Sequence, residues 1–554
     1  MTLTTVGKYL VNSLHDMGIK HVFGVPGDYV LDLMDRFVDS PMKLINTSCE
    51  LGAGYAADGY ARVNGLSALV VTYGVGGLSA FNAVAGAYAE RVPLVVISGA
   101  PHSKMRNSQT MMHHLVGHYT MQLESYRQIT EYAVMLSDGA AVPDKIDEAL
   151  DACLRSKRPV YIEVPVDVVD QLCRQPLPDR QKSALVSNPD ALNEAVREAA
   201  EMLNAAKKPA VFIGMEIRRF GLGECLMQLL EKSGYPVATT IGGKSGIPEN
   251  HPHYIGVYQG GFSLGTAHDI IEEADALLCL GAWMTDMTTG GFTAHIDPNH
   301  MISANSEIVK IKHHFYNQVI LRDFIEHLTN ALKSSPEPDH FHTPTPYKYN
   351  ANFIPTPKKK MTVKRFFERL NQFLDNTMLL VCDTGDVIFG GAEMYREQKE
   401  SHFSQDYYLS IGYSLPAGLG VSLAAPDKRT VVLIGDGALQ MTVQELGSHI
   451  RFNTNALIFI LNNNGYLIER LIHDGPYNEI QTWQYARLPD VFGGGYGVKV
   501  RTEDELELAL QEAKKRSGQT VVIEIVVDKM DSTDTLALVG ERVRKISNNQ
   551  RVSM

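Results

Sequence analysis

Apolar runs of strand length alternate with amphipathic stretches of helix length along most of this chain. The first four apolar runs are HVFGVPG, SALVVTYGVG, VPLVVISGA and PVYIEVPVD. Further along, PAVFIG and ALLCLG enclose the helix-like stretch ECLMQLLEKSG, and TVVLIG and ALIFIL enclose another amphipathic stretch. Buried-type strands that alternate with helices are typical of parallel sheets with crossover helices. The pattern therefore predicts an α/β protein.

Two polar, proline-rich stretches interrupt this alternation, at residues 171–190 and 334–358. Such a composition is typical of linkers between domains. We therefore predict three domains, at residues 1–180, 190–333 and 360–554, each built on a doubly wound parallel sheet. The chain length of 554 residues agrees, because a single hydrophobic core rarely serves more than about 250–300 residues.

Composition and charge exclude several classes of function. A net charge of −12 would repel nucleic acid, and the sequence has no basic stripe interleaved with aromatic residues. There is no signal-like leader and no run of eighteen apolar residues, so we expect a cytoplasmic protein without a membrane partner. The six cysteines show no CxxC spacing, so we expect free thiols rather than disulfides or a zinc site.

Two predicted strands of the last segment end in polar motifs. TVVLIG leads into Gly435-Asp436-Gly437 and a helix, and ALIFIL leads into Asn462-Asn463-Asn464-Gly465. Ligands of open α/β sheets bind at the carboxyl ends of the strands, where glycine N–H groups and a helix start attract anions. Carboxylate, amide and carbonyl oxygens suit magnesium and leave positions for phosphate oxygens. The motifs predict a metal and diphosphate site, although Asp-Gly alone is more often an ordinary turn.

The GDG motif, an interval of twenty-four residues and the Asn-Asn pair together resemble the signature of thiamine-diphosphate enzymes. HVFGVPGDYVLDLMD, CELGAGYAADGYAR and VVTYGVGGLSAFNAVAGAYAERVPLVVISGAP resemble the pyrimidine-binding domain of the 2-oxo-acid decarboxylases of the pyruvate, indolepyruvate and branched-chain type. The resemblance extends from about residue 3 to about residue 545. It implies a pyrimidine-binding, a middle and a diphosphate-binding domain, with thiamine diphosphate and Mg²⁺ as cofactors.

Most cofactor residues are implied by this resemblance. Asp436, Asn463 and the carbonyl of Gly465 would hold magnesium. Ala438 stands where relatives often carry a serine or threonine, so backbone N–H groups would replace a hydroxyl contact to the phosphates. Ile411 matches the bulky residue that bends the cofactor. The other matched contacts are Thr72, Val75, Thr384, Asp386, Gly435, Gly437 and Ile468.

The implied reaction is the non-oxidative decarboxylation of a 2-oxo acid to an aldehyde and carbon dioxide, through an ylide and an enamine of the cofactor. It requires a carboxyl group beside the aminopyrimidine ring. Glu50 fits this role, at the start of a small-residue helix that Gly65 would close. Without the resemblance, a glutamate at a helix start is usually only a favourable placement in the helix dipole.

The stretch TMMHHLVGH places three histidines within six positions. His114 and His118 have the spacing of a metal-binding pair, but Gly117 disfavours a regular helix and no cysteine or carboxylate cluster lies nearby. The resemblance instead implies that His113 and His114 lie in the active site beside Asp28, as acid/base and substrate-orienting groups.

Glu469 is the fourth implied proton-transfer group, although alone it would be an exposed helix residue paired with Arg470 or a neighbour. We expect raised pKa values for the carboxyl groups of Asp28 and Glu469, because crowding and burial disfavour two negative charges. In the family the pyrimidine and diphosphate domains of one site come from different subunits. The resemblance therefore implies a homodimer or homotetramer with active sites at the dimer interface.

Five positions match the substrate end of the site in relatives: Ile388, Ile468, Ile472, Val539 and Val543. Pyruvate-specific relatives place large aromatic residues at positions where this chain has Ile388 and Val539. Since each buried methylene contributes about 0.8 kcal/mol, the roomier pocket predicts aliphatic or branched 2-oxo acids larger than pyruvate. Pyruvate and aromatic acids such as indolepyruvate or phenylpyruvate remain alternatives. A flavin-containing carboligase of the acetohydroxyacid synthase type is a further one.

Overall fold

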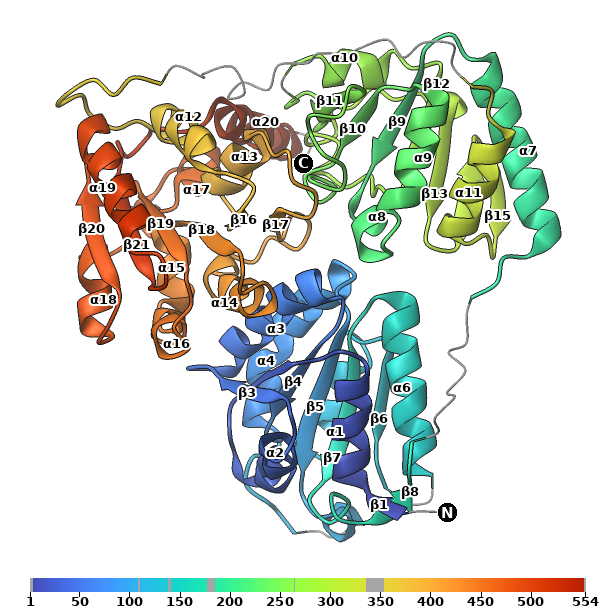
Figure 1. Cartoon of the computed structure of the whole chain (residues 1–554), viewed down its shortest axis with the longest axis vertical. Coiled ribbons are helices and arrows are strands. Elements are labelled where there is room, and N and C mark those ends of the chain that lie inside the picture. Colours follow the sequence, from blue (N-terminus) through green and yellow to red (C-terminus); the bar gives the residue numbers. More distant parts are fainter. Residues whose placement is uncertain are drawn as a thin grey trace.

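The computed structural model describes residues 3–107, 110–137, 141–176, 185–263, 265–334 and 353–552. It contains three α/β units, each built on its own sheet, which we call the first, middle and third units (Figure 1). Parts of both predicted linkers lie outside the described residues, and the domain boundaries at 180, 190, 333 and 360 stay predictions. Among the described helices, none combines the length and apolar character needed to cross a membrane.

The first unit is a doubly wound parallel sheet in the order β3-β2-β4-β5-β7-β6. Helices cover both faces, each with its own hydrophobic core. The central strands are buried on both faces, which explains their continuous apolar runs. The strands are β2 (His21–Gly24), β3 (Lys43–Asn46), β4 (Ser67–Val71), β5 (Leu94–Ala100), β6 (Tyr132–Met135) and β7 (Val160–Pro165). The helices are α1 (Val6–Asp16), α2 (Leu31–Val38), α3 (Glu50–Asn64), α4 (Val75–Ala89), α5 (Met121–Tyr126) and α6 (Val142–Ser156), and a small antiparallel pair joins β1 (Leu3–Thr5) to β8 (Leu172–Arg174).

The third unit has the same architecture, with the parallel order β17-β16-β18-β19-β21-β20 and a core on each face. Its strands are β16 (Met378–Cys382), β17 (His402–Ser404), β18 (Arg429–Gly435), β19 (Leu457–Asn462), β20 (Tyr496–Val500) and β21 (Val521–Val526). Its helices are α12 (Val363–Phe373), α13 (Asp386–Glu393), α14 (Ser414–Ala424), α15 (Asp436–Thr442), α16 (Glu445–Arg451), α17 (Leu467–Ile472), α18 (Leu488–Val491), α19 (Glu503–Lys515) and α20 (Asp534–Val552).

The middle unit confirms the expected α/β fold but adds an antiparallel hairpin. Its strand order is β11-β10-β9-β12-β13-β14-β15, and the pairs β13-β14 and β14-β15 are antiparallel. Two-residue connections join these strands, too short for a crossover helix. The strands are β9 (Pro209–Ile213), β10 (Val237–Thr239), β11 (Tyr254–Val257), β12 (Ala276–Leu280), β13 (Met301–Asn305), β14 (Ile308–Ile311) and β15 (His314–Asn317). The helices are α7 (Pro189–Ala205), α8 (Met215–Arg219), α9 (Gly223–Ser233), α10 (Ala267–Glu272) and α11 (Leu321–Ala331).

The first and third units meet where α3 packs along α14 (Figure 1). The two backbones approach so closely that a Cβ on Gly420 would collide with the carbonyl of Ala56, and one on Gly59 would collide with that of Ala417. This contact explains the small residues of ELGAGYAADGYARVNG, which the sequence showed without indicating a partner. The helix that begins at Glu50 is therefore fixed against the third unit of the same chain.

Candidate active site

A cavity of about 330 Å³ lies at the carboxyl ends of the third unit's strands. It unites most of the residues expected to hold the cofactor. Its lining runs from Thr384 to Glu469 along the chain, and the predicted residues among it are Thr384, Asp386, Ile411, Gly435, Asp436, Gly437, Ala438, Asn463, Gly465, Ile468 and Glu469. The GDG and Asn-Asn motifs come together because β18 and β19 are neighbours in the sheet, with Gly435 opposite Leu461.

The oxygen atoms in this cavity suit a hard cation. Asp436 is 2% exposed, and burial raises the pKa of its carboxyl group to about 6, although N–H groups of the neighbouring backbone act against that shift. The side-chain oxygen of Asn463 is buried and has no hydrogen-bond partner among the described residues. A buried carboxylate and a buried amide oxygen, each directly after one of two adjacent strands, fit Mg²⁺.

The same cavity has room and donors for a diphosphate. A Cβ on Gly435 would meet no atom within 4 Å, so there is unoccupied space beside this glycine at the start of α15. The hydroxyl group of Thr384 is buried, and in the part of the chain that the structure describes it has no hydrogen-bond partner. Helix starts and free hydroxyl groups are donors for phosphate oxygens, so these residues fit the group that the sequence predicted.

Arg470 holds the loop that carries Asn463 and Gly465, a role that the sequence analysis missed. Its buried guanidinium group donates hydrogen bonds to the carbonyl groups of Asn463 and Asn464. Gly465 has a φ of 144°, and a Cβ there would collide with this guanidinium group. Arg470 forms an ion pair with Glu479, at 3.4 Å, so it is not the partner expected for the exposed Glu469.

An apolar cluster lies next to the cavity and contains four of the five predicted substrate residues. Ile388, Ile468, Val539 and Val543 belong to it, and Ile468 also lines the cavity. The middle unit contributes further members, which are Ile241, Phe262, Val257 and Met287. Ile472, at the end of α17, is not among the members of this cluster.

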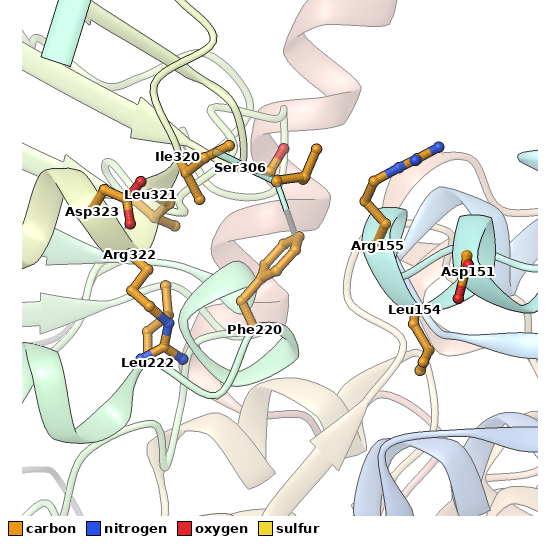
Figure 2. A pocket seen from close by; sticks show the side chains of 11 residues that line it. Asp151, Leu154, Arg155, Phe220, Leu222, Ser306, Ile320, Leu321, Arg322 and Asp323 are labelled. Atoms are coloured by element: carbon orange, nitrogen blue, oxygen red, sulfur yellow. The ribbon is translucent and has the colours of Figure 1, made fainter. Parts of the chain in front are cut away.

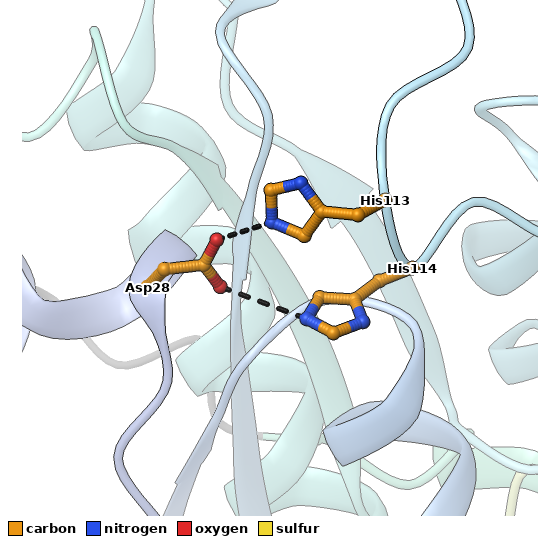
Figure 3. A group of neighbouring side chains, drawn as sticks. All are labelled: Asp28, His113 and His114. Atoms are coloured by element: carbon orange, nitrogen blue, oxygen red, sulfur yellow. Dashed lines mark hydrogen bonds and ion pairs between the residues drawn. The ribbon is translucent and has the colours of Figure 1, made fainter.

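The first unit carries a separate group of three side chains, Asp28, His113 and His114, which we call the histidine cluster (Figure 3). His113 Nε2 makes a direct hydrogen bond to Asp28 Oδ2, and His114 Nε2 lies 3.8 Å from Asp28 Oδ1. These ligand atoms lie within 4.8 Å of one another, a spacing that also suits a metal ion. The direct hydrogen bond between His113 and Asp28 is the kind of contact through which a proton can be exchanged.

Neighbouring residues hold the two imidazole rings in place. Tyr29 stacks on the His113 ring, with 4.9 Å between ring centroids. Gly74 has a φ of 66°, and a Cβ there would collide with the carbonyl of His114. His118 lies apart from the cluster and pairs with Glu124 at 3.9 Å, so the structure brings together the adjacent pair but not the i, i+4 pair.

The expectation of raised pKa values is wrong for Asp28. Burial acts to raise the pKa of this carboxyl group, but the hydrogen bond and charge of His113 and the charge of His114 outweigh it and lower the pKa. The physical reason is exposure, since the side chain of Asp28 is 49% exposed and that of His113 is 56% exposed. In the third unit, which carries the cofactor contacts, burial raises the pKa of Asp386 to about 7.

Glu50 begins α3 as predicted, and Gly65 closes this helix in the left-handed conformation. The Glu50 carboxyl group lies against Gly76, and the methyl group of Thr72 lies against the same glycine. The hydroxyl group of Thr72 is buried, and no described residue forms a hydrogen bond with it. Val75, one position before Gly76, is 54% exposed. Gly27, one position before Asp28, also lies against Thr72, so Glu50, Thr72 and the start of the histidine cluster are close together in the first unit.

Another cavity, of about 360 Å³, lies between the first and middle units (Figure 2). Leu154 and Arg155 of α6 line one side, and Phe220, Leu222 and Arg322 of the middle unit face them. Its lining residues include none of the cofactor motifs. This cavity could not be predicted from the sequence, because Arg155 and Phe220 on its two walls are 65 residues apart and neither wall has a motif of its own.

Comparison with known proteins agrees with this geometry. Residues 4–123 match the thiamine pyrophosphate enzyme N-terminal TPP binding domain, residues 196–332 the central domain, and residues 383–525 the C-terminal TPP binding domain.

Relatives match along nearly the whole chain. A probable pyruvate decarboxylase of Schizosaccharomyces pombe is 34% identical, over 98% of this chain and 96% of its own length. Pyruvate decarboxylase 2 of Arabidopsis thaliana is 34% identical, over 97% of this chain and 91% of its own length. The pyruvate decarboxylase of Neurospora crassa is also 34% identical, over 97% and 96%. The chain belongs to the thiamine-diphosphate-dependent 2-oxo-acid decarboxylases, a family of carboxy-lyases.

Proposed function

We propose that this enzyme converts aliphatic and branched 2-oxo acids larger than pyruvate to aldehydes, at least as efficiently as it converts pyruvate. The observation that carries the proposal is the apolar cluster beside the cavity, in which Ile388 and Val539 stand where the family resemblance places large aromatic residues in pyruvate-specific relatives. Smaller side chains leave more apolar volume for the substrate, and each additional buried methylene contributes about 0.8 kcal/mol.

The proposed cofactors are thiamine diphosphate and Mg²⁺. When bound, the cofactor supplies a nucleophilic thiazolium carbon and then an electron sink. Asp436, Asn463 and the Gly465 carbonyl would hold the metal, and the Thr384 hydroxyl and the start of α15 would bind the diphosphate. Ile411 lines the same cavity and would support the bent form of the cofactor.

The reaction consumes one proton, and we propose that residues of the first unit take part in its transfer. A 2-oxo acid anion and one proton give an aldehyde and carbon dioxide, so the site must deliver a proton to the carbon that loses the carboxylate. Glu50 would exchange a proton with the cofactor ring. His113, His114, Asp28 and Glu469 would orient the substrate carboxylate and supply the proton that completes the aldehyde.

We further propose that each site forms between two copies of the chain, in a homodimer or homotetramer. In the described residues, no hydrogen bond or ion pair joins Glu50 or the histidine cluster to the residues that line the cavity. Val75 and Met441 are 54% and 47% exposed, although each lies beside predicted cofactor residues. A second chain would bury such apolar side chains and exclude water from the acid and base groups.

Mixing two inactive variants tests the shared site. E50Q disables the first-unit half and D436A disables the cavity half, so a mixed dimer contains one intact site and one doubly altered site. Re-association of equal amounts is expected to restore about a quarter of the wild-type activity, because half of the dimers are mixed. A mixture that stays inactive, although mass measurement shows mixed dimers, contradicts the shared site.

A substrate panel tests the activity. The purified enzyme, thiamine diphosphate and Mg²⁺ are combined with pyruvate, 2-oxoisovalerate, 2-oxoisocaproate, phenylpyruvate and indolepyruvate, and aldehyde is read through a coupled alcohol dehydrogenase. We expect kcat/KM values for the two branched acids at or above that for pyruvate. A kcat/KM for pyruvate far above both contradicts the preference but not the reaction.

Pyruvate is the second candidate substrate, because the relatives described above are pyruvate decarboxylases. The panel decides between the two directly. A preference for the aromatic acids would instead show that the cluster opens further around a bound substrate. Carboligation without aldehyde release, together with a bound yellow flavin, would favour the acetohydroxyacid synthase type.

A further inference from the structure

Glu445, in the first turn of α16, is a buried carboxylate at the contact between the third and first units. Its side chain is 0% exposed. Its hydrogen bonds come from neutral groups: Ser448 Oγ donates to Oε2 at 2.6 Å, and the Ser48 backbone N–H donates to the same oxygen at 3.3 Å. The thiol of Cys49 lies 3.7 Å from Oε1. Two of these three partners are the two residues that precede Glu50.

The turn before Glu50 is held at several points by the same segment of the third unit. Ser48 Oγ donates to the carbonyl of Gln444 at 3.1 Å, and Gln444 Nε2 donates to Cys49 Sγ at 3.3 Å. Cys49 is the N-cap of α3 and its sulfur accepts the Gly52 N–H. Because Gly52 has no Cβ, the Glu445 carboxyl group can occupy the space beside the first turn of α3.

The buried carboxylate of Glu445 is stable only where N–H groups compensate its negative charge. Burying it without a cation partner costs free energy, and burial raises the pKa of Glu445. The N–H groups at the start of the 15-residue helix α3 offset this cost, since a helix N-terminus attracts negative charge. The hydrogen bond from the Ser48 N–H and the contact with the Cys49 thiol tie the position of this turn to the carboxyl group of Glu445.

We propose that Glu445 is a positioning residue for Glu50, holding the start of α3 across the boundary between the units so that the Glu50 carboxyl group meets the cofactor of the active site. This inference rests on the proposed role of Glu50. Small displacements of an acid or base group have large effects, because a misplacement of about 1 Å can slow a reaction about 100-fold. Glu445 itself does not contact the reacting atoms.

The test measures the rate at which the thiazolium C2 proton of bound thiamine diphosphate exchanges for deuterium in the presence of Mg²⁺. This rate depends on the proposed proton exchange between Glu50 and the cofactor and requires no substrate. We expect E50Q to slow this exchange by about 100-fold or more, and E445A and E445D by about 10- to 100-fold. E445Q keeps an oxygen acceptor for Ser48 and Ser448, so its exchange rate should stay within about twofold of wild type. Cofactor affinity and subunit assembly should change little in all four variants.

E368A is the matched control for loss of a buried carboxylate. Glu368 lies in α12 of the same unit, 5% exposed, and pairs with Arg365 at 2.8 Å. We expect a lower melting temperature with an unchanged exchange rate. If E445A fails to fold, E445D compared with E445Q decides, since only E445D withdraws the acceptor.

The double variant E50Q/E445A separates positioning from an independent effect. If Glu445 acts through Glu50, the double variant exchanges as slowly as E50Q and no slower. Multiplied effects, or an E445D rate equal to wild type while E50Q is slow, overturn this inference and leave the role of Glu50 intact. An E50Q rate equal to wild type overturns the role of Glu50 and this inference with it.

Discussion

The two halves of the candidate site differ in how far a single chain completes them. In the third unit, Asp436 is 2% exposed and lies in a cavity of about 330 Å³ with the other cofactor residues. In the first unit, Asp28 and His113 are about half exposed. One chain therefore preorganises the binding half but leaves the acid and base half open to water. Acid and base groups have strongly shifted pKa values only where water is excluded, so another part of the assembly must bury the acid and base groups of the first unit.

The difference follows from the elements that carry the residues. Asp436 and Asn463 stand at the ends of two adjacent parallel strands, whose register fixes their spacing. His113 and His114 lie on a loop between β5 and α5, held by a ring stack and a close backbone contact rather than by a sheet. Sites built on sheet ends are more rigid than sites built on loops.

Removal of the Asp436 carboxylate should have the largest effect, because it deletes the only predicted charged metal ligand. We expect D436A to weaken thiamine diphosphate binding in Mg²⁺ at least about 100-fold. Equilibrium binding measured by fluorescence quenching checks this. D474A, which removes an exposed carboxylate on the loop after α17, is the control. Binding by D436A within a few-fold of wild type would show that the cavity is not the cofactor site.

A change in the histidine cluster should affect the chemistry and spare binding. H114Q is expected to lower kcat about 100-fold, since positioned acid or base groups typically contribute about 10²- to 10⁴-fold, while cofactor affinity stays within about twofold. The control is H118Q, because His118 lies on the same loop but outside the cluster. Equal losses in H114Q and H118Q would contradict the assignment. A large loss of cofactor affinity in H114Q would show that the histidine cluster also binds the cofactor, and that the two halves of the site do not have separate roles.

A larger side chain in the apolar cluster should change the preference among 2-oxo acids without abolishing decarboxylation. V539F reduces the space beside Ile388 and Ile468, so we expect kcat/KM for 2-oxoisocaproate relative to pyruvate to fall about tenfold. L538F is the matched control, because Leu538 is the neighbour in α20 and is 41% exposed. An unchanged ratio in V539F would place the substrate elsewhere in the cavity.

The smallest expected effect is on stability and its pH dependence in the third unit. Burial raises the pKa of Asp386 from 3.8 to about 7, and hydrogen bonds from Thr533 lower it only in part. A carboxyl group with a raised pKa binds its proton more tightly in the folded state, so its ionisation removes stability as pH rises from about 4 to about 7. Asn in its place stays neutral and can still accept from Thr533.

We therefore compare the melting temperatures of cofactor-free D386N and wild type at two pH values. The difference, D386N minus wild type, should be about 2–4 °C larger at pH 8 than at pH 5. Thermal denaturation of both proteins at the two pH values measures this. A difference between the proteins that is constant with pH, or larger at pH 5, would show that Asp386 is already ionised in the folded chain.

Local patterns predicted much of the fold and of the cavity. The apolar runs became β2, β4, β5, β7, β9, β12, β18 and β19, and the GDG motif lies at the end of β18 as expected. The doubly wound parallel sheet predicted for the middle unit did not include the antiparallel β14-β15 hairpin. Its two-residue connections, Ser306-Glu307 and Lys312-His313, lack the Asn-Gly or Asp-Gly pair that would signal a hairpin turn.

The supporting residues could not be predicted in the same way. Tyr29 follows Asp28 directly in the sequence, but its stacking on His113 joins positions 84 residues apart. Arg470 was considered only as a partner of its neighbour Glu469, whereas its guanidinium group binds backbone carbonyls of the loop before α17. Glu445 lies 395 residues from Glu50 and shows no motif. Contacts of this kind depend on which helices pack together.

The sequence by itself determined the family, the alternation of strands and helices, and the motifs that carry oxygen ligands and histidines, because these depend on residues close together in the chain. Only the tertiary structure decided that Asp28 keeps a low pKa, that Ile472 lies outside the apolar cluster, and that Glu445 holds the start of the Glu50 helix. The physical reason is that burial, charge neighbours and close backbone approach are properties of packed surfaces. Residues far apart in the sequence supply those surfaces.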